Sequence, residues 1–199
     1  RLSFNNILDA DSAWGVVSDY SEPAVAVVKH TNPCGLAIHP DQSIAYTRAF
    51  EGDTLSAYGG IVGFNRAVTE ATATAMRGVF YEIIVAPCYE PAALEILKKR
   101  RKARILQLLP SSGPLSKVDV RRVSGGALIQ LSDDIEESPS SWKAVTDRRP
   151  TDAEMADLAF AWRAAKHIRS NTIVLASDGA LVGMGAGQPN RLASVHLAL

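Results

Sequence analysis

A lysine and a histidine stand side by side at the end of an apolar run near the start of this chain. Lys29 and His30 follow the sequence AVAVV, which is typical of a buried strand, and precede the polar turn TNPCG. A histidine can act as base and acid near neutral pH, and a lysine can stabilise developing negative charge. At a strand end both side chains can turn into a crevice of the kind where open α/β sheets bind ligands. The pair predicts a proton-transfer site, with a solvated strand end as the alternative.

A second segment, residues 170–191, combines an asparagine, alternate glycines and an arginine around apolar runs. Asn171 precedes the run TIVLA, where its amide either caps the preceding helix or orients a substrate. The glycines are Gly183, Gly185 and Gly187. Together with a helix N-terminus and Arg191, their backbone N–H groups would form an anion site. The spacing matches neither the dinucleotide fingerprint nor a P-loop, so a structural turn and a phosphate site both stay open.

Three further positions are candidates. Gly59, followed by Gly60, lets the backbone pass close to a ligand or forms a plain turn. Glu82 opens an apolar strand, where it either accepts hydrogen bonds from a ligand hydroxyl or is a surface carboxylate. His167 is expected to be a helix-end residue rather than a catalyst.

The zinc signature of the deaminases requires His-x-Glu and Pro-Cys-x-x-Cys. Two positions after His30 stands Asn32 rather than Glu, and neither Cys34 nor Cys88 belongs to a Cys-x-x-Cys pair. We therefore expect no metal.

Composition narrows the classes of protein further. The 199 residues are 47% hydrophobic, enough for the core of one large domain or two small ones. Charges balance at 21 basic and 21 acidic residues, which argues against nucleic-acid binding. The basic run 98–104 is expected to end a helix rather than form an anion patch. No apolar run is long enough to span a membrane, and two cysteines make no disulfide framework, so we expect a cytoplasmic protein. The chain begins with Arg1, so we expect a longer natural protein.

The order of elements predicts an α/β fold with layers of helices and sheet. Expected strands are 24–29, 61–64, 82–86, 104–109, 118–123, 127–131, 172–176 and 181–184. Expected helices are an opening one capped by Asn5 or Asn6, then 43–50, 68–79, 90–99, one starting at the capping box Thr151–Glu154, and a last one with Pro189 in its first turn. The helix after Thr151 is expected to bury Met155, Leu158, Ala159, Trp162, Ala165 and Ile168.

Together, five segments resemble the AICAR transformylase domain of the bifunctional purine-biosynthesis family that also carries IMP cyclohydrolase. They are NNILDADSAW, VAVVKHTNPCGLA, SAYGGIVGFNR, EIIVAPCYEPAALEILKK and RSNTIVLASDGALVGMGAGQPNR, in family order across nearly the whole chain. The resemblance implies deaminase-like α/β subdomains with mixed sheets flanked by helices. Residues 1–115 would form the first and 116–199 an incomplete second, with the cyclohydrolase domain absent. It also implies that further site segments lie before residue 1 and after residue 199.

The resemblance implies transfer of a formyl group from 10-formyltetrahydrofolate to the 5-amino group of aminoimidazole carboxamide ribonucleotide (AICAR). It implies these roles: His30 as base, Lys29 assisting proton movement, Asn171 against the carboxamide, Gly59 and Glu82 in the nucleotide pocket, and Arg191 binding the nucleotide. It further implies reduced folate as co-substrate, no metal, and a homodimer with active sites at its interface. Two alternatives remain, a nucleotide-binding module without turnover and a zinc-free relative of deaminases with another reaction.

Overall fold

The structure is a computed structural model of the chain, and it describes residues 1–100, 102–109, 118–133 and 138–199. The chain divides into two compact units, one formed by 1–108 with 150–199 and the other by 109–149. The subdomain boundary expected at 115/116 lies within 110–117, outside the described residues, so that division stays a prediction.

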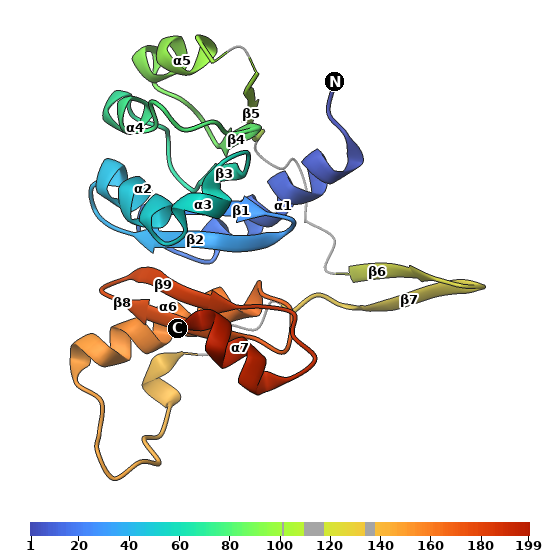
Figure 1. Cartoon of the computed structure of the whole chain (residues 1–199), viewed down its shortest axis with the longest axis vertical. Coiled ribbons are helices and arrows are strands. Elements are labelled where there is room, and N and C mark those ends of the chain that lie inside the picture. The colour runs from blue at the N-terminus through green and yellow to red at the C-terminus, as the bar shows by residue number, and fades with distance from the viewer. Residues whose placement is uncertain (101, 110–117, 134–137) are drawn as a thin grey trace. The chain divides into compact units, whose positions relative to one another are not determined.

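The first unit is built on a seven-stranded mixed sheet, which confirms the α/β class (Figure 1). The strand order is β5 (Arg104–Gln107), β4 (Ile83–Ala86), β3 (Ile61–Phe64), β1 (Ala24–Lys29), β2 (Asn32–Ile38), β9 (Ala180–Gly185) and β8 (Ile173–Ser177). Strands β3, β4 and β5 are parallel to one another, and the remaining neighbours are antiparallel. The antiparallel pairings make β1 and β9 run opposite to the other five strands, so strands both begin and end at each edge.

Helices cover both faces of this sheet. One face packs against α1 (Phe4–Ser18) and α6 (Asp152–Lys166), and the other against α2 (Gln42–Glu51), α4 (Glu70–Ala75) and α5 (Pro91–Lys98). The short α3 (Thr54–Ala57) precedes β3, and α7 (Arg191–Ala198) packs against β9. In β1, Val25 and Val27 point into one core and Ala26 and Val28 into the other. Burial on both faces explains why β1 is a continuous apolar run.

The second unit contains the hairpin of β6 (Val118–Val123) and β7 (Gly126–Leu131), which confirms the expected pair of strands. A 3-10 turn, η1 (Pro139–Ser141), follows it. In the described parts of the chain, we find no helix with the length and apolarity that crossing a bilayer requires.

Several helix boundaries differ from the expectation. Helix α1 is capped by Ser3, and Asn6 completes a capping box from inside the first turn, so the expected Asn5 or Asn6 cap is wrong. Helix α4 covers Glu70–Ala75, much less than 68–79, because the Thr69 side chain caps its start and the helix already ends before the C-cap Met76. Helix α7 begins at Arg191 after the cap Asn190, which leaves Pro189 outside the helix.

The capping box of α6 is confirmed, with Thr151 and Glu154 bonded reciprocally. The expected buried face is wrong in part. Phe160 is buried, whereas Leu158 and Trp162 are 51% and 57% exposed. The ring of Tyr20 packs on Phe160 and its hydroxyl donates to the Phe160 carbonyl, which turns the helix toward this neighbouring stripe.

Candidate functional site

The register of the sheet brings the first group of predicted residues to one edge. Strand β1 ends at Lys29, and its neighbour β3 begins where Ile61 pairs with Val28. Strand β4 begins beside it, since Ile61 pairs with Ile83. Glu82 immediately precedes β4, and Gly59 lies two residues before β3. The edge therefore combines the C-terminal end of β1 with N-terminal ends of β3 and β4, unlike the crevice at strand C-termini in parallel sheets.

The second group reaches the same edge through β9 and β8. Strand β9 runs antiparallel to β2 from the pair Ala37–Ala180, so its C-terminal end lies toward the start of β2. Strand β8 begins where Ile173 pairs with Gly185. Asn171, two residues earlier, is thus at the edge where the β1–β2 turn lies.

The β1–β2 connection is a tight hairpin turn in which both central residues have a left-handed backbone. His30 has φ of 52° and Thr31 of 63°, the signature of a type I′ turn, for which Asn-Gly is the usual sequence. The Thr31 N–H donates to Oδ1 of Asp9 over 2.8 Å, and Asn32 Nδ2 donates to the His30 carbonyl over 2.9 Å. The turn presents the exposed His30 side chain at the sheet edge. The sequence predicted a constrained polar turn here but not a hairpin.

Strand β2 begins directly after this turn, at Asn32, and includes Pro33. The sequence predicted Pro33 to lie in a polar turn, but it lies inside β2, where proline donates no ladder hydrogen bond. The ladder accommodates it through a register shift between Val27 and Val28, opposite this position. The histidine is therefore held between two paired strands rather than on a loose strand end.

Lys29 lies beside the segment that carries Gly59. Its Nζ donates to the Tyr58 carbonyl over 3.1 Å. Gly59 has φ of 74°, and its N–H donates to the Phe80 carbonyl over 2.8 Å. A side chain at Gly59 would meet no atom within 4 Å, so the positive φ, rather than crowding, favours glycine there.

Glu82 joins this group through helix α1. Its Oε2 accepts from Asn6 Nδ2 over 2.9 Å, and its backbone N–H donates to the Gly60 carbonyl over 2.9 Å. Asn6 and Asp9, three residues apart on α1, thus reach Glu82 and the His30–Thr31 turn. Sequence reasoning missed both of them. The available signal was the i, i+3 spacing of the two polar residues, which places them on one face of the helix.

Glu82 also lines a shallow pocket of about 460 Å³ with Phe80, Lys102, Ala103 and Arg104. The pocket is open and mostly polar. It places a carboxylate next to two basic residues at the start of β4 and β5.

Asn171 and Arg191 form a second cluster. Arg191 Nη2 lies 3.5 Å from Asn171 Oδ1, while Asn171 Nδ2 donates to the Gln188 carbonyl over 3.0 Å. Ser194 Oγ donates to the Asn171 carbonyl over 2.9 Å, which ties the cluster to α7. Among the described residues, no hydrogen bond or ion pair links this cluster to Lys29 or His30.

The glycines of this segment have different roles. Gly183 and Gly185 lie within β9, and a Cβ there would stand 1.9 Å from the carbonyl oxygens of Ala198 and Ser194, respectively. They let α7 pack directly on the strand, so these two belong to a strand rather than to the structural turn that was one of the two expectations. Gly187, with φ of 64°, lies in the loop before α7.

Comparison with known proteins decides the family. The family described as "AICARFT/IMPCHase bienzyme" matches residues 1–199. The chain belongs to this family. Proteins named "Bifunctional purine biosynthesis protein PurH" from Dictyostelium discoideum, Microcystis aeruginosa and Enterococcus faecalis are 47%, 46% and 46% identical to it over its full length. The chain spans 38–39% of the length of these relatives.

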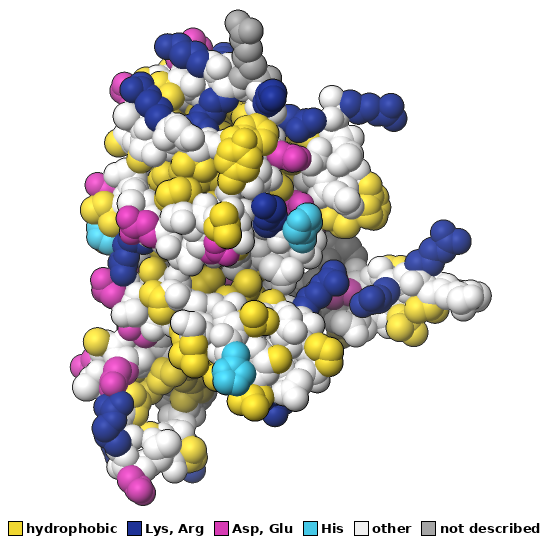
Figure 2. Space-filling model, viewed as in Figure 1, with side chains coloured by type: hydrophobic (Ala, Val, Ile, Leu, Met, Phe, Trp, Pro, Cys, Tyr) yellow, Lys and Arg dark blue, Asp and Glu magenta, His cyan; other side chains and the backbone are white. Residues whose placement is uncertain are grey.

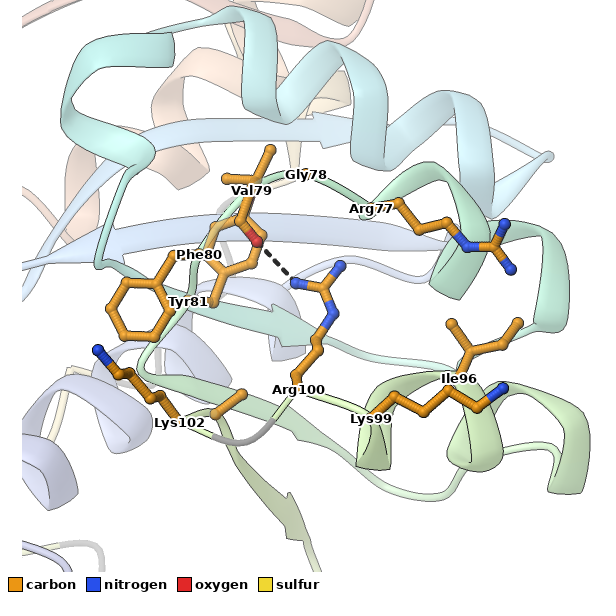
Figure 3. A pocket seen from close by; sticks show the side chains of 10 residues that line it. Arg77, Gly78, Val79, Phe80, Tyr81, Ile96, Lys99, Arg100 and Lys102 are labelled. Carbon is orange, nitrogen blue, oxygen red and sulfur yellow. Dashed lines mark hydrogen bonds between the residues drawn. The ribbon is translucent and has the colours of Figure 1, made fainter.

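The chain also has a basic pocket of about 510 Å³ at the C-terminal ends of α4 and α5. Figure 2 shows several Lys and Arg side chains in this part of the molecule. In Figure 3, Arg100 lies in the middle, whereas Arg77 and Lys99 extend to one side and Lys102 to the other. Arg100 donates to the carbonyls of Val79 (2.7 Å) and Met76. Burial lowers the pKa of Arg100. Its guanidinium binds carbonyl groups at the C-terminal end of α4. This agrees with the structural interpretation of the run 98–104.

Two further side chains have structural partners inside the fold. Cys34 is buried, its Sγ donates to the Val27 carbonyl over 3.3 Å, and burial raises its pKa to about 12. His167 caps the end of α6 as expected, with Nε2 2.8 Å from Oδ2 of Asp19. Over the described ranges, we find no group of three or more His, Cys, Asp or Glu side chains placed to hold a metal.

Proposed function

We propose that the chain takes part in purine biosynthesis by transferring a formyl group from 10-formyltetrahydrofolate to the 5-amino group of AICAR. Membership of the AICARFT/IMPCHase family over the whole chain carries the proposal. The relatives, described as bifunctional purine biosynthesis proteins, support the pathway. The adjacent His30 and Lys29 would supply a base and a cation, two groups that can accelerate acyl transfer to an amine.

In this proposal the amine nitrogen attacks the formyl carbon and His30 takes the proton that the amine loses. Lys29 stabilises the negative charge that develops on the formyl oxygen. The bond from the formyl carbon to N10 of the folate then breaks, and N10 receives a proton. An aromatic amine flanked by a carboxamide is a poor nucleophile, so positioning and proton removal are expected to dominate the rate.

The remaining residues are proposed to bind the nucleotide. Glu82 and Gly59 lie beside Lys29 at the sheet edge, where a carboxylate suits the ribose hydroxyls. Asn171 would face the carboxamide and Arg191 the phosphate. Reduced folate as co-substrate, a homodimer with the site at its interface, and a cytoplasmic location are part of the same proposal.

His30→Ala in the full-length protein tests the reaction. We expect kcat for formyl transfer to fall by about 10²- to 10⁴-fold, the usual contribution of a general base. His196→Ala is the matched control, because His196 is exposed on α7 and should leave the rate unchanged. Full activity in the His30 variant would refute its role as base.

The same material separates the two alternatives. A nucleotide-binding module would bind AICAR with equal affinity in wild type and His30→Ala, and neither would form product. A relative of the deaminases would release ammonia without folate. Formation of formylated nucleotide that depends on added folate supports the proposal over both.

A further inference from the structure

Helix α1 contacts the candidate site at two points through one polar stripe. Asn6 donates to the Glu82 carboxylate, and Asp9 accepts from the Thr31 N–H. Asn6 is 8% exposed and Asp9 is half-buried, so neither is a solvated surface group. Below this stripe, Ala10 and Ala13 anchor the helix in the core. The two polar residues are therefore held on a rigid element rather than on a loop.

Each of the two contacts fixes a group that would otherwise be free to move. His30 and Thr31 both have a left-handed backbone, which is strained at non-glycine residues and persists only where the surrounding structure holds it. The hydrogen bond to Asp9 supplies such a constraint from outside the hairpin. Glu82 receives its side-chain hydrogen bond from Asn6, which sets the direction of the carboxylate.

We propose that Asn6 and Asp9 are positioning residues, with Asp9 holding the turn that presents His30 and Asn6 orienting Glu82. The catalytic consequence rests on the proposed formyl transfer. In that setting α1 fixes the distance between the base and the nucleotide-binding carboxylate. The two substitutions should then affect different steps, Asp9 the chemical step and Asn6 the binding of nucleotide.

Asp9→Ala and Asp9→Asn in the full-length protein test the first contact. The asparagine keeps an oxygen where Oδ1 stands, so it can still accept from the Thr31 N–H. We expect Asp9→Ala to lower kcat by about 10- to 100-fold, as small misplacements of catalytic groups do, while KM changes little. Asp9→Asn should restore the rate to within about threefold of wild type, since the acceptor remains. Asp11→Ala, an exposed aspartate on the same helix, is the matched control.

Asn6→Asp tests the second contact without removing the helix cap. Asn6 accepts from the Ser3 N–H through Oδ1, which aspartate retains, but aspartate replaces the donor toward Glu82 with a second negative charge. We expect the dissociation constant of AICAR, measured by calorimetry, to rise about tenfold, which corresponds to 1.4 kcal/mol. Kinetically, the change should appear in KM more than in kcat.

Hydrogen exchange measured by mass spectrometry supplies a readout that does not depend on activity. The Thr31 amide should exchange faster in Asp9→Ala than in wild type, and not in Asp9→Asn. If wild type transfers no formyl group, the proposed function fails while exchange still decides the Asp9 contact. If His30→Ala is inactive but Asp9→Ala keeps full kcat and unchanged exchange, the positioning role is wrong and the proposed function stands. Equal losses in Asp9→Ala and Asp11→Ala would also overturn it.

Discussion

His30 and Thr31 show how much local structure one candidate catalytic residue requires. A left-handed backbone at two successive residues without glycine is rare, and it is least favourable for a β-branched residue such as Thr31. The turn is held by Thr31 Oγ1 and Asn32 Nδ2, which both donate to the His30 carbonyl, and by Asp9. Strain that the surroundings impose is common where a side chain must be presented in one orientation.

At the same scale, Cys34 yields a prediction about reactivity. Burial raises its pKa to about 12, so at pH 8 the thiol is protonated and inaccessible, whereas Cys88 is exposed. When the full-length protein is titrated with a thiol reagent at pH 8, we expect Cys88→Ser to have one fast-reacting thiol fewer than wild type. Cys34→Ser should leave the fast count unchanged and lower the total only after denaturation. A fast equivalent lost in Cys34→Ser would contradict the burial.

Residue chemistry was in part readable from the sequence. The pairing of Lys29 with His30 after an apolar run pointed to a site because residue type and position suffice for that inference. Asp9 could not be found in the same way, since its contact with Thr31 joins residues 22 apart and depends on how α1 packs on the sheet. Tertiary hydrogen bonds of this kind leave no local pattern.

At the scale of elements, α7 lies so close to β9 that two strand positions exclude any side chain. Gly185→Ala would place a methyl group 1.9 Å from the Ser194 carbonyl oxygen. We expect the substitution to destabilise the protein by about 1–3 kcal/mol, the usual cost of overpacking, or to displace α7. Because Ser194 also donates to the Asn171 carbonyl, that displacement would disturb Asn171.

Calorimetry of the full-length protein measures this effect as a lower Tm. Gly126→Ala is the control, since a Cβ at Gly126 meets no atom within 4 Å. Equal Tm values for wild type and Gly185→Ala would show that α7 does not lie on β9 as described.

Elements were predicted best where one strong local signal decided them. The apolar run of β1 and the capping box at Thr151 each fixed a boundary. The buried face of α6 was missed because two adjacent apolar stripes were available, and Tyr20, 140 residues from Phe160, selects between them. The glycines of β9 looked like a turn because the sequence does not show the helix that packs over them.

At the scale of the whole chain, residues 1–108 and 150–199 combine into one unit although 41 residues of the other unit separate them. The sheet connects them through the pair Ala37–Ala180, and Arg48 bridges to Asp178 over 3.0 Å. This pairing of distant segments was not predictable from the sequence, because strand order depends on long-range register rather than on local pattern.

A third connection, between Asp19 after α1 and the end of α6, should make stability depend on pH. Burial raises the pKa of Asp19, but hydrogen bonds and charges from His167 and Lys166 outweigh it, so its pKa lies below the ordinary value of an aspartate. A carboxyl group whose pKa is lowered on folding stabilises the protein above its unfolded value and loses that contribution as pH falls through the folded one. The stabilisation by Asp19 should therefore be present at pH 7 and 5 and decline once pH falls below the ordinary pKa of an aspartate.

Asp19→Asn tests this connection in urea unfolding of the full-length protein at pH 7, 5 and 3. Wild type should unfold at higher urea than the variant at pH 7 and 5, and the difference between the two midpoints should be smaller at pH 3, because stability falls once the unfolded carboxyl group begins to bind protons that the folded one does not. Asp11→Asn, at an exposed position on α1, should show no such convergence. A difference of equal size at all three pH values would mean that Asp19 stabilises the unit by packing rather than by its charge. Convergence would instead show that ionisation of one carboxylate contributes to holding two segments 147 residues apart in sequence, Asp19 and Lys166, in one unit.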